Sequence, residues 1–246
     1  MVNGPPTPPA TTPVELQDAA RSTASVAEPS VSLPPQIDPQ LRPEVYQRAL
    51  QGIGAALARK DYQSAGSIAG EADFITATDR QPARMLIVAP LVLVHLINDN
   101  IPPARYALLR LPDNLISLPL ARALGALVIY AMNRQHAQLY EQINILKSIV
   151  SQPDFFDQEL GHQVVDLATV FTERFCERTF ILLSKAYTSL PLSLACIYLN
   201  LPAEKVTNGA QKSGWSYDAS TQILYPSYSS LATFDLVADS VARLEG

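Results

Sequence analysis

The chain of 246 residues has 18 Lys and Arg residues, 23 Asp and Glu residues, a formal net charge of −5 and 48% hydrophobic residues. This hydrophobic content can fill the core of one large domain or two small ones. The negative charge argues against a nucleic-acid-binding protein that relies on a broad basic surface, because phosphate binding requires clustered Lys and Arg. The longest apolar run, Met85–Ile97, is shorter than the roughly 20 residues that a membrane-spanning helix needs. We therefore expect no membrane span.

Residues 1–40 differ in composition from the rest of the chain. They hold nine of the 20 prolines, five charged residues and no aromatic residue. Such a segment cannot bury enough apolar surface to offset the roughly 1–2 kcal/mol per residue that backbone ordering costs. We predict a disordered, Pro-rich tail without the basic start and apolar core of a signal peptide. The two cysteines, Cys176 and Cys196, form no disulfide framework, which favours a reduced, intracellular compartment.

Paired helices are predicted over residues 41–175. The first follows Pro43 and carries an apolar stripe at Tyr46, Leu50, Ile53 and Leu57. Further helices are expected at residues 61–72 and 82–98, from residue 102 onward, and at residues 118–135 and 137–150. We expect Pro90 to kink or split the helix at residues 82–98. The helix–turn–helix unit repeats about every 35–40 residues, which is typical of an α-solenoid of tetratricopeptide type.

The next helical region is expected to start at Pro153 and to reach about Ser189, with a break or bend near Gly161–His162. A winged helix is predicted over residues 176–228. Its elements are a short helix at 191–199, a second helix from Pro202 to about Gly214, and a hairpin in which Trp215 and Tyr217 alternate with polar residues before Ile223–Tyr225 returns. We expect Trp215 to pack under the wing.

A last, amphipathic helix is predicted over residues 229–246. Its apolar residues are three or four positions apart and form one stripe: Leu231, Phe234, Val237, Val241 and Leu244. A lone helix of this length is marginal in water, so the stripe must pack against something. It can fold back on its own chain or join helices of other proteins, and the sequence leaves both open.

Several segments resemble the PCI-domain family, and within it subunit eight of the COP-nine signalosome. The segment Asn100–Pro112 (NIPPARYALLRLP) is similar to its signature Asn-x-x-x-Ala-Arg-Tyr-x-x-x-Arg-x-Pro, and Ala186–Ser189 (AYTS) to its Ala-Tyr-Thr-Ser. Leu199–Pro202 (LNLP), Gly214–Trp215 with Asp218, and Tyr225–Pro226 follow in the family's order. The fold implied by the resemblance is a mainly α one, a helical-repeat solenoid followed by a small winged helix and a terminal helix.

The resemblance implies a non-catalytic scaffold subunit of the COP-nine signalosome, the complex that removes Nedd8 from cullin-RING ubiquitin ligases in cytoplasm and nucleus. The partners implied are other PCI subunits, reached through the winged-helix edge and a bundle of terminal helices. We therefore expect interface residues in the hairpin, at Tyr217, Ile223 and Tyr225, and in the terminal stripe. The equivalent small PCI subunits of the proteasome lid and of translation initiation factor three are alternatives of the same class.

The motifs of common enzymes are missing. The histidines, His95, His136 and His162, form neither a His-x-His pair nor HExxH, and no phosphate-cradling Gly-rich loop or GxSxG occurs. We expect no catalytic residue, cofactor or metal, although an unrecognised hydrolase is one alternative. A winged-helix nucleic-acid-binding protein is the alternative of another class, but its recognition helix offers only Lys205 and Lys212.

Overall fold

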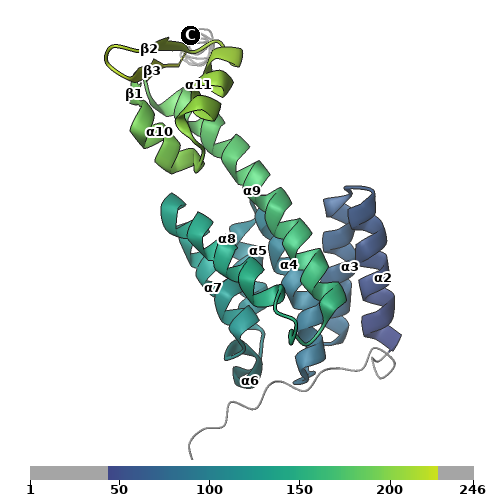
Figure 1. Ribbon diagram of the computed structural model, residues 1–246. Helices are drawn as coiled ribbons and strands as arrows, with labels where there is room; N and C mark the ends of the chain where they lie inside the picture. Colours follow the sequence, from purple (N-terminus) through teal and green to yellow (C-terminus); the bar gives the residue numbers. More distant parts are fainter. Residues whose placement is uncertain (1–43, 227–246) are drawn as a thin grey trace, which may run out of the picture. The chain divides into compact units, whose positions relative to one another are not determined.

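The computed structural model describes residues 44–226, which form helices followed by a small sheet (Figure 1). The predicted tail at residues 1–40 and the predicted terminal helix at 229–246 lie outside the described residues. The solenoid consists of α2 (Glu44–Ala58), α3 (Tyr62–Ile75), η2 (Pro82–Arg84), α4 (Met85–Ile97), α5 (Ile101–Leu109), α6 (Asp113–Ile116), α7 (Pro119–Met132) and α8 (His136–Val150). The helix α9 (Gln158–Ala186) follows, and the winged helix comes last.

The helical pairing is confirmed, and the same kind of turn closes each pair. Lys60, Asp99 and Arg134 have positive φ angles of 58°, 59° and 55°, and each lies two residues before the first residue of the second helix of a pair. A left-handed residue after a helix C-terminus ends the helix and reverses the chain. These residues are 39 and 35 positions apart, so the turns recur with the period of the repeat.

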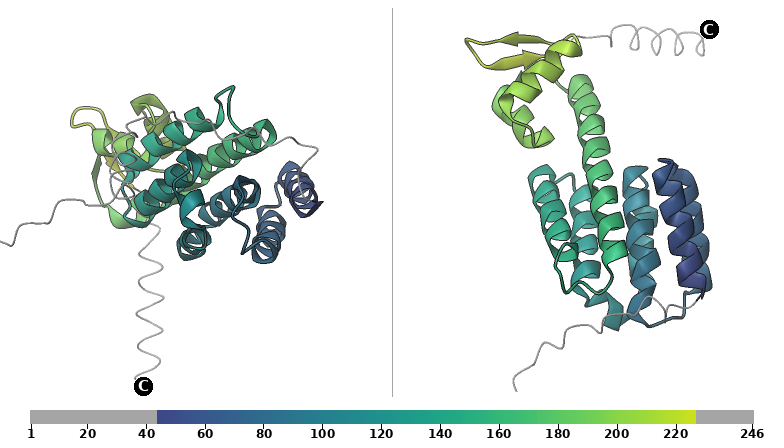
Figure 2. Two further views of the ribbon diagram at one scale, coloured as in Figure 1. Left: turned by 90° about the horizontal axis from the view of Figure 1, so that it is seen from below. Right: turned by 45° about the vertical axis from the view of Figure 1, so that its right-hand side comes forward.

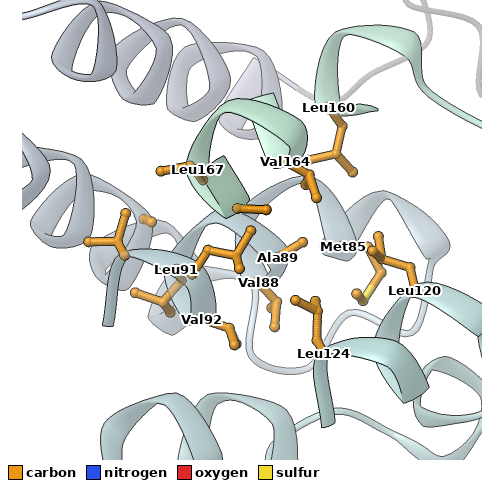
Figure 3. Close-up of a cluster of buried hydrophobic side chains, with 14 of the residues drawn as sticks. Met85, Val88, Ala89, Leu91, Val92, Leu120, Leu124, Leu160, Val164 and Leu167 are labelled. Atoms are coloured by element: carbon orange, nitrogen blue, oxygen red, sulfur yellow. The ribbon is translucent and has the colours of Figure 1, made fainter. Parts of the chain in front are cut away.

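The core of the solenoid is centred on α4. Almost every residue of this helix is buried, and it packs against α2, α3, α5, α7 and α9. Figure 3 shows Val88, Leu91 and neighbouring residues of α4 between Leu120 and Leu124 of α7 and Leu160, Val164 and Leu167 of α9. The helix continues through Pro90 and is not split there. A helix that is apolar on every face is stable only when it is surrounded in this way.

The helix α9 differs from the prediction in where it begins and in having no break. It begins at Gln158 rather than Pro153, because the Asp157 side chain caps it by accepting a hydrogen bond from the Leu160 amide at 2.8 Å. It also runs through Gly161 without a break. A Cβ atom at Gly161 would lie 2.7 Å from the Val150 carbonyl oxygen, so this glycine permits close packing of α9 against the end of α8.

The winged helix is confirmed, with one strand more than predicted. It comprises β1 (Leu190–Pro191), α10 (Leu192–Leu199), α11 (Ala203–Lys212), β2 (Ser216–Asp218) and β3 (Ile223–Tyr225). The antiparallel sheet has the order β1-β3-β2, so β3 is its central strand. A second hydrophobic core lies beneath it, where Trp215 is 5% exposed and its ring stacks on Phe180 at 4.6 Å.

The helices of the solenoid lie side by side in each view of Figure 2, with α9 packed against α4 and α8. Phe175 of α9 belongs to the core of the solenoid, and Leu183 of the same helix belongs to the core of the winged helix. One helix therefore contributes to both cores. Within residues 44–226, no helix combines the length and the apolar content that crossing a bilayer requires.

Candidate protein-interaction site

The two faces of the winged-helix sheet differ in exposure. Tyr217 lies opposite Leu224 in the β2–β3 ladder, and Leu224 lies opposite Leu190 in the β3–β1 ladder. Leu224 and Leu190 are fully buried, and Tyr217 packs against the same core. Because residues directly opposite one another share a face of the sheet, Tyr217 belongs to the inner face.

Ile223 and Tyr225 lie on the outer face. Successive side chains of a strand point to opposite faces of the sheet, so both side chains lie on the face opposite to that of Leu224. Tyr225 is 39% exposed and Ile223 is half-buried. Of the three interface residues predicted in the hairpin, the structure brings these two together on an accessible face and separates Tyr217 from them.

The strand β2 is an edge of the sheet. In the described part of the chain, β2 pairs with β3 and with no other strand. An edge strand keeps backbone N–H and C=O groups that can pair with a strand of another protein. The outward-pointing backbone groups of Ser216–Asp218 are thus available for strand addition next to the exposed Tyr225.

The hairpin turn is organised by Asp218. Its carboxylate accepts hydrogen bonds from the Ser220 amide at 2.9 Å, the Ser220 hydroxyl at 2.7 Å and the Thr221 hydroxyl at 2.8 Å. These hydrogen bonds lower the pKa of Asp218 to about 2, and the bond from the Ser220 side chain has the largest effect. Gln222 closes the turn with a left-handed φ of 56°. Its carbonyl oxygen accepts a hydrogen bond from the Leu192 amide at 2.9 Å, which ties the hairpin to α10.

A groove opens between α9 and α11 on the winged helix. It has a volume of about 390 Å³ and is lined mainly by apolar side chains, among them Phe180, Ile181, Leu199, Leu201 and Val206. Cys176 lies in its wall and donates to the Leu199 carbonyl oxygen, with 3.6 Å between sulfur and oxygen. Burial raises the pKa of the Cys176 thiol. A raised pKa leaves less of the nucleophilic thiolate at neutral pH.

The helix α11 would be the recognition helix of a nucleic-acid-binding winged helix. It buries Val206 and Ala210 against the core and exposes Lys205 and Lys212, with Glu204 beside the first lysine. Two lysines partly offset by a carboxylate are a weak phosphate-binding surface.

A buried ion network was missed by the sequence analysis. Asp73 of α3 accepts from Arg84 at 3.0 Å, and both side chains are almost completely buried. The guanidinium of Arg110, from the segment Asn100–Pro112, also binds the Asp73 carboxylate. A signal was present, because Asp73 follows the small buried residues Ala65 and Ala69 at a spacing of four and so lies on the buried face of α3.

The histidines lie apart from one another. His95 and His136 are half-buried, and burial lowers the pKa of both, whereas His162 is exposed. The described residues contain no group of three or more His, Cys, Asp or Glu side chains placed to hold a metal ion.

A helical-repeat solenoid that continues into a winged helix is the architecture of a PCI-type module. The comparison of sequences agrees with this class. Residues 83–232 match the model of the CSN8/PSMD8/EIF3K family, so the chain belongs to that family. It is a PCI-type scaffold subunit, and proteins of this type are subunits of multiprotein complexes. No curated protein matches the chain significantly.

Proposed function

We propose that the chain is a non-catalytic scaffold subunit of the COP-nine signalosome and supports assembly of the complex that removes Nedd8 from cullin-RING ubiquitin ligases. The observation that carries the proposal is the segment Asn100–Pro112, which resembles the signature of subunit eight. Its Arg110 binds the buried carboxylate of Asp73, so this part of the resemblance is supported by a structural role. The signalosome operates in cytoplasm and nucleus, and we propose the same locations for this chain.

The proposed contacts with sister subunits use the two surfaces predicted from the sequence. The first is the wing, where the β2 edge, Ile223 and Tyr225 are accessible and Tyr217 supports them from the inner face. The second is the terminal stripe, Leu231, Phe234, Val237, Val241 and Leu244, which we propose joins a bundle with the terminal helices of other subunits. Apolar stripes of this spacing are typical of helices that associate with helices.

The test is affinity purification of the tagged full-length chain followed by mass spectrometry of the proteins that co-purify. We expect the subunits of the COP-nine signalosome, including its metalloprotease. Recovery of proteasome-lid subunits or of initiation factor three instead would contradict the signalosome assignment and place the chain in the matching complex of the same class. A chain that elutes alone would contradict the scaffold function itself.

A gel-shift titration tests the alternative of another class, a winged-helix nucleic-acid-binding protein. Phosphate contacts weaken steeply as salt rises, so a winged-helix nucleic-acid-binding protein would bind duplex DNA or RNA with a strong dependence on salt. We expect no shift near physiological salt. A sequence-specific shift that is lost in a Lys205→Glu variant would favour the nucleic-acid function.

A further inference from the structure

The groove between α9 and α11 is an apolar surface without a cover among residues 44–226. Phe180, Leu199 and Val206 line it together with Cys176, and Ile181 in its lining is 53% exposed. Glu177 and Lys205 are its charged residues. A groove of this composition fits the apolar face of a helix better than a polar ligand.

The chain leaves the sheet next to this groove. Tyr225, at the end of β3, pairs with Ser216 of β2, so their backbones are about 5 Å apart. Ser213, three residues before Ser216, lines the groove, and Gly214 turns the chain between them with a φ of 80°. The last described residue, Pro226, therefore lies near one end of the groove.

The chain that follows is long enough to cover the groove. Residues 227–228 can reach about 7 Å when extended, and the helix predicted over residues 229–246 carries the terminal stripe. A helix over these 18 residues is about 27 Å long. A short connection of this kind raises the effective concentration of the segment at the groove to the millimolar range, which a separate partner rarely reaches.

We infer that, in the free chain, the terminal stripe docks intramolecularly into the α9–α11 groove, with Phe234 near its centre. This goes beyond the proposed function, because the docking needs no partner and is the same in any of the three complexes. It also has a consequence for assembly. One stripe cannot face its own groove and a bundle of helices at once, so assembly must release the segment and expose the groove.

The first experiment uses the thiol that the groove already contains. In a full-length Cys196→Ala background, Cys176 is the single thiol, and its rate of reaction with a maleimide reports access to the groove. We expect Phe234→Asp to raise this rate about tenfold, because a charge in the stripe opposes its burial. Ala232→Asp adds the same charge outside the stripe and should leave the rate unchanged. Circular dichroism and the urea midpoint establish that both variants fold.

Equal labelling rates in the parent, Phe234→Asp and Ala232→Asp chains would overturn the inference. So would equal acceleration by both substitutions, because docking through the stripe predicts a difference between them.

The second experiment measures proximity and does not depend on weakening the segment. Phe234→Cys and, as the matched control, Ala232→Cys are made in the same Cys196→Ala background and treated with a short bis-maleimide at low protein concentration. We expect an intramolecular link to Cys176 that forms several-fold faster from position 234. Links that appear only between two chains would assign the groove to a second copy, and a link that requires added partner subunits would assign it to them. Either result would overturn intramolecular docking, while the purification test of the complex would stand unaffected.

Discussion

Asp73 joins three elements of the solenoid through its two carboxylate oxygens. One oxygen accepts from Arg84, which also donates to the Ala77 carbonyl oxygen at 2.7 Å, and the other accepts from Arg110 after α5. Arg84 is fully buried, whereas the Arg110 side chain is half exposed. A buried ion pair adds little net stability over apolar packing, but loss of one partner leaves an uncompensated charge in the interior. The network therefore fixes how the ends of α3 and α5 meet η2.

We expect Asp73→Ala to lower the free energy of unfolding by about 3–5 kcal/mol, because the buried guanidinium of Arg84 loses its counter-charge. The measurement is urea unfolding followed by circular dichroism. Arg174→Ala is the matched control, since it breaks an exposed ion pair with Glu177 and should change the free energy by less than about 1 kcal/mol. Similar losses in both variants would mean that the buried network is not a special constraint.

Substitutions of Trp215 and Tyr225 test two different properties of the wing, its folding and its role as an interface. Trp215 is 5% exposed and stacks on Phe180, so Trp215→Ala should cost about 3–5 kcal/mol and disrupt the wing. Tyr225 is 39% exposed on the outer face, and Tyr225→Ala should cost about 1 kcal/mol or less while weakening recovery of partner subunits. The two variants are compared by urea unfolding and by quantitative co-purification. Full recovery of partners with Tyr225→Ala would mean that this residue is not part of the interface.

At the scale of elements, the helices were largely predictable and the packing of α9 was not. Apolar spacing, proline at helix starts and Asp61 as an N-cap, which accepts from the Ser64 amide at 3.0 Å, are local signals. Gly161 carries no such signal. From the sequence it resembles a helix breaker, but the partner that requires a glycine is the Val150 carbonyl oxygen, whose position depends on how α8 meets α9.

We expect Gly161→Ala to destabilise the protein even though alanine favours helix by about 1 kcal/mol. The new Cβ atom would lie 2.7 Å from a backbone oxygen, so α8 and α9 would have to move apart. Gly125→Ala in α7 is the matched control. Its Cβ would meet nothing within 4 Å, so the substitution should stabilise the chain by up to about 1 kcal/mol. Thermal unfolding of both variants measures the difference, and a rise in Tm with Gly161→Ala would show that the contact tolerates a methyl group.

At the scale of the molecule, the order of the parts followed from the sequence but their connections did not. The repeat period, the winged helix and the family resemblance gave the order of solenoid and wing. The strand β1 was not predictable, because two residues after a long helix carry no strand pattern and pair only once β3 is in place. The Asp73 network and the two faces of the sheet likewise depend on residues far apart in sequence. The predicted interface in the terminal stripe stays a prediction.

The solenoid and the winged helix meet at a cluster of aromatic rings. The His136 ring of α8 lies 5.4 Å from Phe175 of α9 and 5.0 Å from Tyr198 of α10, measured between ring centroids. Tyr140 of α8 donates from its hydroxyl to the Tyr198 carbonyl oxygen at 3.3 Å. Burial lowers the pKa of His136, since the charged imidazolium is poorly solvated among these rings.

The lowered pKa of His136 predicts how stability changes with pH. An unfolded histidine has a pKa of about 6.5, so the unfolded chain binds the proton before the folded chain does as the pH falls. The contribution of His136 is therefore fully present above pH of about 6.5 and is lost progressively toward the lower pKa of the folded state. His95, whose pKa burial also lowers, acts in the same direction.

We expect the urea midpoint to fall from pH 7.5 to pH 5, and His136→Gln to flatten part of this decline, because glutamine cannot take up a proton. The remaining slope should diminish further when His95→Gln is added. His162→Gln, at an exposed position, controls for the loss of an imidazole as such. A decline in the His136→Gln chain as steep as in the parent would mean that the contact between solenoid and winged helix does not respond to pH. A flatter one would show that protonation of His136 at this junction weakens the PCI module in acid.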